Sequence, residues 1–331
     1  MAANRTLPDV PTAALHIVTG KGGTGKTTVA AALAVALATG GRRTLLIEVE
    51  GRQGLAQLFD VAPLPYEEKR LASAPRRGEV YGLAVDPEQA FLEYLDMFFN
   101  LRRAGRALRA MGAIDFVTTI APGMRDVLMT GKVKEAAVRT ERSGENVYDA
   151  VILDAPPTGR IRQFLDVTRD VAGLTKMGPI HKQSQGVTDV LHRPSTRVHL
   201  VTLLEEMPVQ ETLDAAADLR AGGFHLGHAV VNRNRPELFA AGLVRRTETG
   251  RLGERKALGT GLAEAGLGAE LTNPLAQQLA DYALRQHVQE ENAARLEALN
   301  RPTVRLPELA APIDLGDLYE LAAVLGEAIV A

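Results

Sequence analysis

The chain has 331 residues, 46% of them hydrophobic, with a formal net charge of −2 and no cysteine. This length and apolar content suffice for a large buried core, and the balanced charge supplies no basic field for nucleic acid or an anionic membrane. The lack of cysteine excludes disulfides, thiolate nucleophiles and sites in which cysteine binds a metal or arsenite.

The first predicted strand covers residues 15–19 and runs into residues 20–27, GKGGTGKT, which fit the phosphate-binding pattern G-x-x-x-x-G-K-S/T. An Ala-, Leu- and Val-rich helix is predicted directly afterwards, over residues 27–37. Glycines let backbone N–H groups converge on an anion, and the N-terminus of the helix adds free donors and a positive dipole end. The segment therefore predicts a P-loop that binds the phosphates of a nucleotide.

Each part of this loop has an expected role. Lys26 should reach the β- and γ-phosphates as a mobile charge, and the hydroxyl of Thr27 is placed to ligate Mg²⁺. Thr28 should contact the α-phosphate. The residues expected to bind the nucleotide here are Gly22, Gly23, Thr24, Gly25, Lys26, Thr27 and Thr28.

Later apolar runs alternate with helical stretches, which predicts a doubly wound, mainly parallel α/β sheet in a single domain over residues 12–331. The further predicted strands cover residues 44–49, 82–85, 147–153, 198–203, 228–231 and 303–306. Residues 87–140, together with about 165–195, predict an inserted helical subdomain, because the first stretch is too long for one crossover helix. The glycine-rich residues 234–273 predict a surface excursion before a helix over residues 274–299.

The strand at residues 147–153 delivers Asp154 to the edge of the sheet where open α/β folds bind ligands. Its carboxylate would hold Mg²⁺, through a water. The following Thr158-Gly159 can present a backbone N–H to the γ-phosphate, so Gly159 would sense its loss.

Three features together resemble one known family: the nine-residue run GKGGTGKTT, the run DAPPTG from Asp154 to Gly159, and Val231-Asn232 at a strand end. The chain is similar to the ArsA arsenite-transport and tail-anchored-protein targeting ATPases, within the deviant Walker A group of MinD, ParA and the nitrogenase iron protein. The resemblance implies a P-loop NTPase fold of the SIMIBI type. It also implies that Lys21 crosses a dimer interface to the partner's phosphates and that Asn232 recognises adenine.

The resemblance further implies a Mg²⁺-dependent ATPase that works as a dimeric switch, in a homodimer or in a heterodimer with a related, unequal subunit. A protein client would bind the helical subdomain. Two alternatives remain: a low-activity regulatory subunit of a heterodimer, and a positioning switch like ParA or MinD. No apolar run approaches the ~20 residues that cross a bilayer, and no secretory signal precedes the first strand, so we expect a cytoplasmic protein with no nucleic-acid partner and no stable membrane anchor.

The second predicted strand departs from the family. Relatives end it with an aspartate that positions the attacking water, whereas this chain has Glu50 there. A carboxylate one methylene longer can still hold water, but a small displacement from in-line geometry slows turnover, so we expect slow hydrolysis. Glu48 is an alternative, because strand alternation would place both acids on one face.

Overall fold

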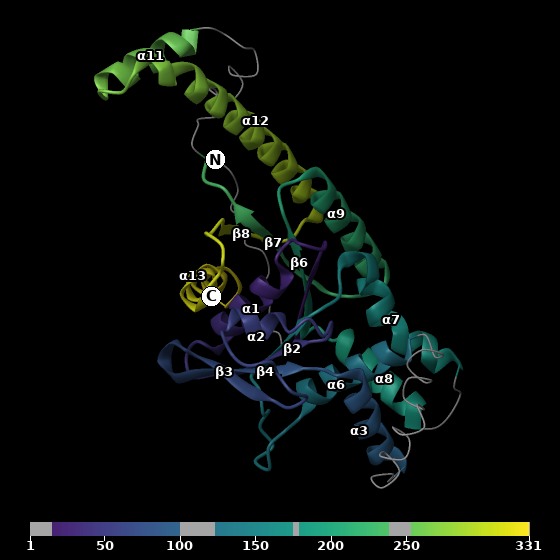
Figure 1. Ribbon diagram of the computed structural model, residues 1–331. Coiled ribbons are helices and arrows are strands. Elements are labelled where there is room, and N and C mark those ends of the chain that lie inside the picture. The colour runs from purple at the N-terminus through teal and green to yellow at the C-terminus, as the bar shows by residue number, and fades with distance from the viewer. Residues whose placement is uncertain (1–14, 100–122, 175–178, 238–252, 331) are drawn as a thin grey trace, which may run out of the picture.

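The computed structural model describes residues 15–99, 123–174, 179–237 and 253–330 (Figure 1). Eight strands form one sheet in the order β3-β4-β2-β5-β1-β6-β7-β8. All neighbouring strands are parallel except β3 and β4, which are antiparallel. The strands are β1 Leu15–Gly20, β2 Arg43–Glu48, β3 Lys69–Ala74, β4 Gly78–Ala84, β5 Ala150–Asp154, β6 Thr196–Thr202, β7 Leu226–Asn234 and β8 Thr303–Pro307.

The helices cover both faces of this sheet, as a doubly wound fold requires. They are α1 Lys26–Ala38, α2 Gly54–Leu58, α3 Pro87–Phe99, α6 Met124–Val138, α7 Thr158–Leu174, α8 Pro179–Leu191, α9 Glu206–Ala221, α11 Gly253–Glu264, α12 Thr272–Leu296 and α13 Leu315–Leu325. Short 3-10 turns lie at Pro75–Arg77, Ala269–Leu271 and Glu297–Leu299, and a π-helical turn, Gly326–Val330, follows α13. The predicted α/β fold is therefore confirmed.

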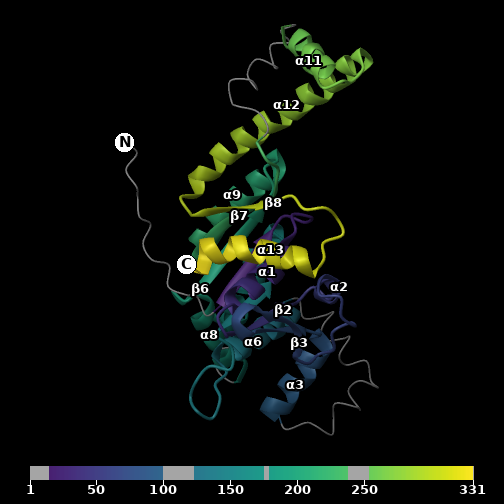
Figure 2. The same cartoon turned by 90° about the vertical axis from the view of Figure 1, so that its left-hand side faces the viewer.

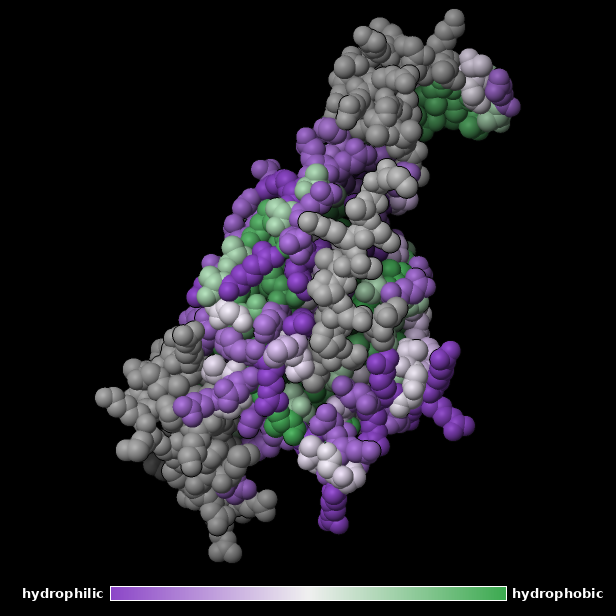
Figure 3. All heavy atoms as spheres, turned by 180° about the vertical axis from the view of Figure 1, so that it is seen from behind, coloured by the Kyte–Doolittle hydropathy of each residue, from purple (hydrophilic) through white to green (hydrophobic). Residues whose placement is uncertain are grey.

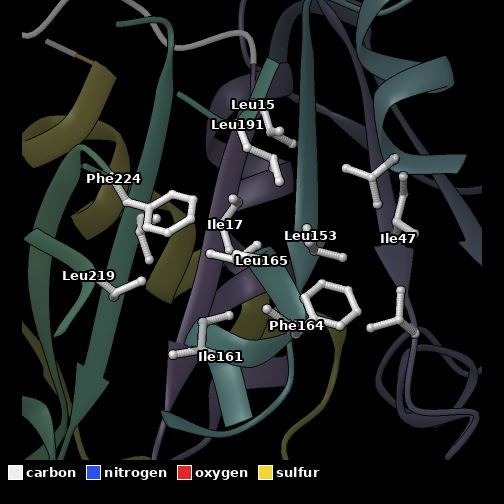
Figure 4. Packing of buried hydrophobic residues seen from close by; sticks show 14 of the residues in the cluster. Leu15, Ile17, Ile47, Leu153, Ile161, Phe164, Leu165, Leu191, Leu219 and Phe224 are labelled. Carbon is white, nitrogen blue, oxygen red and sulfur yellow. The ribbon is translucent and has the colours of Figure 1, made fainter. Parts of the chain in front are cut away.

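Two apolar layers form because successive residues of a strand point to opposite faces. Leu45 and Ile47 of β2 belong to the layer under α6, α7, α8 and α9, whereas Leu46 belongs to the layer under α1 and α13. Figure 1 shows α1 and α13 on one side of the sheet, with α7 and α9 on the other. In the close view, Phe164 of α7 lies over Leu153 of β5 (Figure 4). Both side chains are fully buried.

Four helices lie together at one end of the molecule. Helix α6 packs against α3, α7 and α8, and α7 packs closely against α8 (Figure 1). Helices α3, α6 and α8 fall within the two ranges predicted for a helical subdomain, whereas α7 begins at Thr158, before the second range, and residues 100–122 and 175–178 lie outside the described part of the chain. Helix α7 begins at Thr158, four residues after Asp154, so it connects the end of β5 with α6 and α8.

Two segments differ from the sequence prediction. The edge strand β3 was not predicted, because Lys69, Arg70 and Ser73 break the apolar pattern of a buried strand. It pairs with β4 through a register shift between Arg70 and Ala72. In addition, the predicted excursion at residues 234–273 contains α11, and its residues 238–252 lie outside the described chain.

Helix α12, which is 25 residues long, leaves the body of the molecule and carries α11 at its far end (Figures 1 and 2). Its base is tied to α9, where Arg295 Nη2 donates a hydrogen bond to Gln210 Oε1 over 2.6 Å. Exposed Leu267 and Leu271 lie in the connection between α11 and α12. From behind, the surface is mainly hydrophilic, and apolar residues show as separate patches, one of them on this projecting pair (Figure 3). Within the described residues, every helix is too short or too polar to cross a membrane.

Three buried histidines stack across β1, β6 and β7. The ring centroids of His16 and His199 are 5.2 Å apart, and those of His199 and His228 are 5.8 Å apart. Burial, followed by the charge of His16, holds the pKa of His199 well below its usual value. Burial, followed by the charge of Arg301, lowers the pKa of His228 to about 4.

This stack predicts a specific loss of stability in acid. Unfolded histidines titrate near pH 6.5, so between about pH 6.5 and 4 the unfolded chain binds protons that the folded chain does not. The free energy of unfolding should therefore keep the full contribution of His199 and His228 above pH 6.5 and fall below that pH by up to ~1.4 kcal/mol per pH unit for each of these two residues. Urea denaturation at several pH values measures this. A His228→Gln variant should lose part of the slope, and an unchanged slope would contradict the assignment.

Candidate functional site

The P-loop lies between β1 and α1, at the centre of the sheet. Strand β1 is flanked by β5 and β6, so the carboxyl ends of three parallel strands meet there. Gly23 and Gly25 have φ of 85° and 86°, which other residues rarely adopt. A Cβ on Gly20 would lie 2.2 Å from the carbonyl oxygen of Val201, and one on Gly25 would lie 2.3 Å from Nδ2 of Asn232. Backbone conformation therefore favours glycine at positions 23 and 25, and close packing requires it at positions 20 and 25.

Thr27 and Asp154 lie together, as a shared metal site requires. The Thr27 hydroxyl donates a hydrogen bond to Oδ2 of Asp154 over 2.7 Å. The other carboxylate oxygen, Oδ1, is buried and has no hydrogen-bond partner within the described part of the chain. A buried carboxylate oxygen without a donor fits Mg²⁺, which prefers oxygen ligands.

The charge of Asp154 supports the same fit. Burial raises its pKa to about 7, while the hydrogen bond from Thr27 and the charge of Lys26 oppose this rise. A cation would stabilise the ionised carboxylate. The described residues contain no group of three or more His, Cys, Asp or Glu side chains able to hold a metal. Thr27 and Asp154 would supply oxygen ligands from the protein, and phosphate oxygens and water would supply the others.

Lys26 begins α1 and is 8% exposed. Burial lowers its pKa, whereas the charges of Asp154 and Glu50 act to raise it and that of Arg52 lowers it further. The ammonium group thus lies among opposing charges at the positive end of α1. Nucleotide phosphates would add negative charge that favours its protonated form.

The sequence leaves open whether Glu48 or Glu50 positions the attacking water, and the structure shows that the two side chains have different surroundings. Strand β2 ends at Glu48, so the alternation rule does not extend to Glu50. Glu48 is buried, and its two carboxylate oxygens accept hydrogen bonds from the N–H groups of Gly54 and Leu55, each over 3.2 Å. Glu48 therefore anchors the start of α2. Glu50 is half-buried in the following loop, with a carboxylate oxygen 3.8 Å from Nε of Arg52.

Glu50 faces a small polar cavity of about 170 Å³. Its other walls come from the loop after β5 and from the first turns of α6 and α7, where Arg160 Nη2 lies 3.3 Å from Oδ2 of Asp126. Water can enter a polar cavity of this size. Glu50 is therefore the acid with access to water, while both oxygens of Glu48 are used in the fold.

Lys21 has an intramolecular partner that the sequence did not predict. Its Nζ forms an ion pair with Glu211 of α9. The second oxygen of the Glu211 carboxylate accepts a hydrogen bond from the Thr158 hydroxyl, over 3.2 Å. Glu211 thus contacts both the P-loop, at Lys21, and the start of α7, at Thr158. Sequence reasoning missed it because a lone acid on a helix carries no motif.

Asn232 of β7 also contacts the P-loop. Its Nδ2 donates a hydrogen bond to the carbonyl oxygen of Thr24 over 2.9 Å, which leaves its side-chain oxygen for another donor. Thr24 is almost fully buried, and its hydroxyl bonds back to the carbonyl oxygen of Lys21. Its side chain therefore shapes the loop, and only its backbone remains for phosphate.

A cavity of about 520 Å³ opens beside Asn232. It is lined by Gly25 and Thr28 on one side and, on the other, by the last residue of β8, Pro307, and the segment after it, which contributes Glu308, Leu309, Ala310, Ala311 and Ile313. Its position next to the P-loop and its mixed lining suit a purine and its ribose. The sequence did not point to the segment after β8, because only the fold brings it to Asn232.

The remaining predicted residues lie around the same loops. Gly159 is in the first turn of α7, and a Cβ added there would meet no atom within 4 Å. The same holds for Gly22 and Gly23. These three glycines therefore border open space at the carboxyl edge of the sheet, where a phosphate chain can approach their backbones.

Comparison with known proteins agrees with this geometry. The family of anion-transporting ATPases matches residues 14–193. ATPase BagA of Mycobacterium tuberculosis is 52% identical over 316 residues, covering 95% of this chain and 92% of that protein. The arsenical pump-driving ATPases of Acidiphilium multivorum and Escherichia coli are 24% and 25% identical, and each alignment covers 67% of this chain and 40% of the relative. This chain therefore matches only part of each pump.

Proposed function

Because the chain belongs to the ArsA-type family of anion-transporting ATPases, we propose that it hydrolyses ATP and works as a dimeric switch. The observation that carries this proposal is the contact between Thr27 of the P-loop and Asp154, whose second oxygen is buried without a partner. Nucleotide binding follows from the family. Hydrolysis, Mg²⁺ dependence, assembly and the client are our proposal, and the cycle is expected to run in the cytoplasm.

The chain's own residues divide the work. The backbone N–H groups of the P-loop and the start of α1 hold the phosphates, and Lys26 neutralises the β- and γ-phosphates. Asn232 holds the P-loop in shape and offers its oxygen to the amino group of adenine. Thr27 and Asp154 would hold Mg²⁺, which would offset the negative charge of the phosphates. Glu50 orients water from the adjoining cavity toward the γ-phosphate.

Nucleotide state would reach the helical layer through α7. Gly159 lies in the first turn of this helix, and the next residue, Arg160, is paired with Asp126 of α6. A shift of the loop after Asp154 on loss of the γ-phosphate would therefore act on both α6 and α7. We propose that a protein client or partner responds to this movement.

The assembly part of the proposal is tested with a second copy of this chain. Sedimentation velocity of the purified protein should show a monomer alone and a dimer with Mg²⁺ and a non-hydrolysable ATP analogue. Lys21→Met should weaken this assembly while ATP still binds, because Lys21 would serve the partner's nucleotide. A wild-type chain that stays monomeric with nucleotide contradicts the dimer, and equal assembly of the variant contradicts the role of Lys21.

One observation favours a second function. The glutamate at position 50 is one methylene longer than the family's aspartate, which suits a subunit that binds nucleotide and regulates an unequal partner. Appreciable ATP turnover by the purified chain alone would exclude this reading. Turnover that rises only on adding a related subunit would favour it.

A further inference from the structure

Glu211 lies between the P-loop and the start of α7 and contacts both. Its carboxylate pairs with Nζ of Lys21 in the P-loop and accepts a hydrogen bond from the hydroxyl of Thr158. The three groups come from three elements: the loop after β1, the first residue of α7, and the second turn of α9. Neither the P-loop pattern nor the run after Asp154 includes Glu211.

The contact is placed where nucleotide would disturb it. Lysine is a compact charge on a flexible stem, so one ammonium group can exchange a carboxylate for a phosphate. ATP in the P-loop brings several negative charges close to Lys21 and Glu211. These charges attract the lysine and repel the carboxylate.

We propose that Glu211 is a positioning residue that keeps Lys21 folded onto its own chain until nucleotide is bound. We call the contact among Glu211, Lys21 and Thr158 the Glu211 latch. This inference rests on the proposed function, in which Lys21 serves the nucleotide of a second protomer. In the closed latch Lys21 is held on α9, and in the open latch it extends to the partner while Thr158 becomes free to move with α7.

The latch is weak enough to open. The side chains of Lys21 and Glu211 are 32% and 35% exposed, and ion pairs with this much water access stabilise a structure by about 0.2–1 kcal/mol. Removing such a pair shifts an equilibrium by about 1.4- to 5-fold. The latch therefore adjusts the nucleotide concentration needed for assembly and does not block assembly outright.

The test measures dimerisation by sedimentation velocity as Mg²⁺ and a non-hydrolysable ATP analogue are titrated. Glu211→Gln keeps the shape of the side chain and removes its charge, so half-maximal assembly should need about 1.4- to fivefold less nucleotide than in the wild type. The same substitution in a Lys21→Met background should have no effect, because Glu211 acts through Lys21. A purely structural role of Glu211 would give the same shift in both backgrounds.

Glu206→Gln is the matched control. Glu206 is exposed in the first turn of the same helix, so this variant removes the same charge away from Lys21 and should assemble as the wild type does. If wild type and Lys21→Met assemble equally, the proposed role of Lys21 fails. If Lys21→Met is impaired but Glu211→Gln matches the wild type, or Glu206→Gln shows the same gain, the latch fails and the proposed function stands.

Discussion

Replacing Lys26 with alanine should remove most of the ATP hydrolysis. Lys26 is buried at the start of α1 and lies within the electrostatic influence of Asp154 and Glu50. No other described lysine is buried in the P-loop, so the variant leaves developing phosphate charge without this partner. The loss of one such group lowers kcat by about 10²–10³-fold. Release of phosphate from ATP measures turnover, and titration with a fluorescent ATP analogue measures the accompanying loss of affinity.

The fold should survive this change. Alanine is the best helix former, and a carboxyl group at Asp154 whose pKa is already about 7 can take up a proton when its positive neighbour is lost. Lys69→Ala, on the exposed edge strand β3, removes the same charge away from the nucleotide and should hydrolyse ATP normally. Retained turnover in Lys26→Ala, with normal thermal unfolding, would remove Lys26 from the phosphate site.

The Glu50→Gln variant should bind ATP and hydrolyse it much more slowly. The amide keeps the shape of the side chain but is a poor proton acceptor, and loss of a positioned base lowers the rate by about 10²–10⁴-fold. Affinity for ATP should be equal or higher, since a negative charge beside Lys26 is lost. Single-turnover hydrolysis and equilibrium binding measure the two effects separately.

Glu48→Gln tests the other acid by the same substitution. The Glu48 carboxylate accepts from Gly54 and Leu55 at the start of α2, so its loss should lower thermal stability more than turnover. Normal turnover in Glu50→Gln together with lost turnover in Glu48→Gln would reverse the two assignments. A wild-type chain without turnover would favour the regulatory subunit.

The sequence was sufficient for the central sheet, because the signals there are local. Buried parallel strands read as continuous apolar runs, and α1 was predicted at residues 27–37 and lies at Lys26–Ala38. The P-loop spacing and the aspartate at the end of β5 were visible for the same reason. Their contact, between Thr27 and Asp154, spans 127 positions and was available only through the expected order of strands.

The features that sequence reasoning missed depend on tertiary contacts or weak patterns. Strand β3 carries too much charge to be recognised, and it is stabilised by pairing with β4. The separation of Glu48 from Glu50 depends on where β2 ends, and strand ends are poorly defined by apolar pattern alone. The carboxylate of Glu211 meets Lys21 across 190 positions, which no local spacing can encode.

The length of helix α12 means that a small tilt at its base produces a large displacement at its tip. At ~1.5 Å per residue its 25 residues extend ~37 Å, so a tilt of ~5° at the base sweeps the tip through about 3 Å. The base is bonded to Gln210, the neighbour of Glu211 on α9. A small tilt of α9 beside Lys21 would therefore be amplified along α12 into a larger displacement of α11.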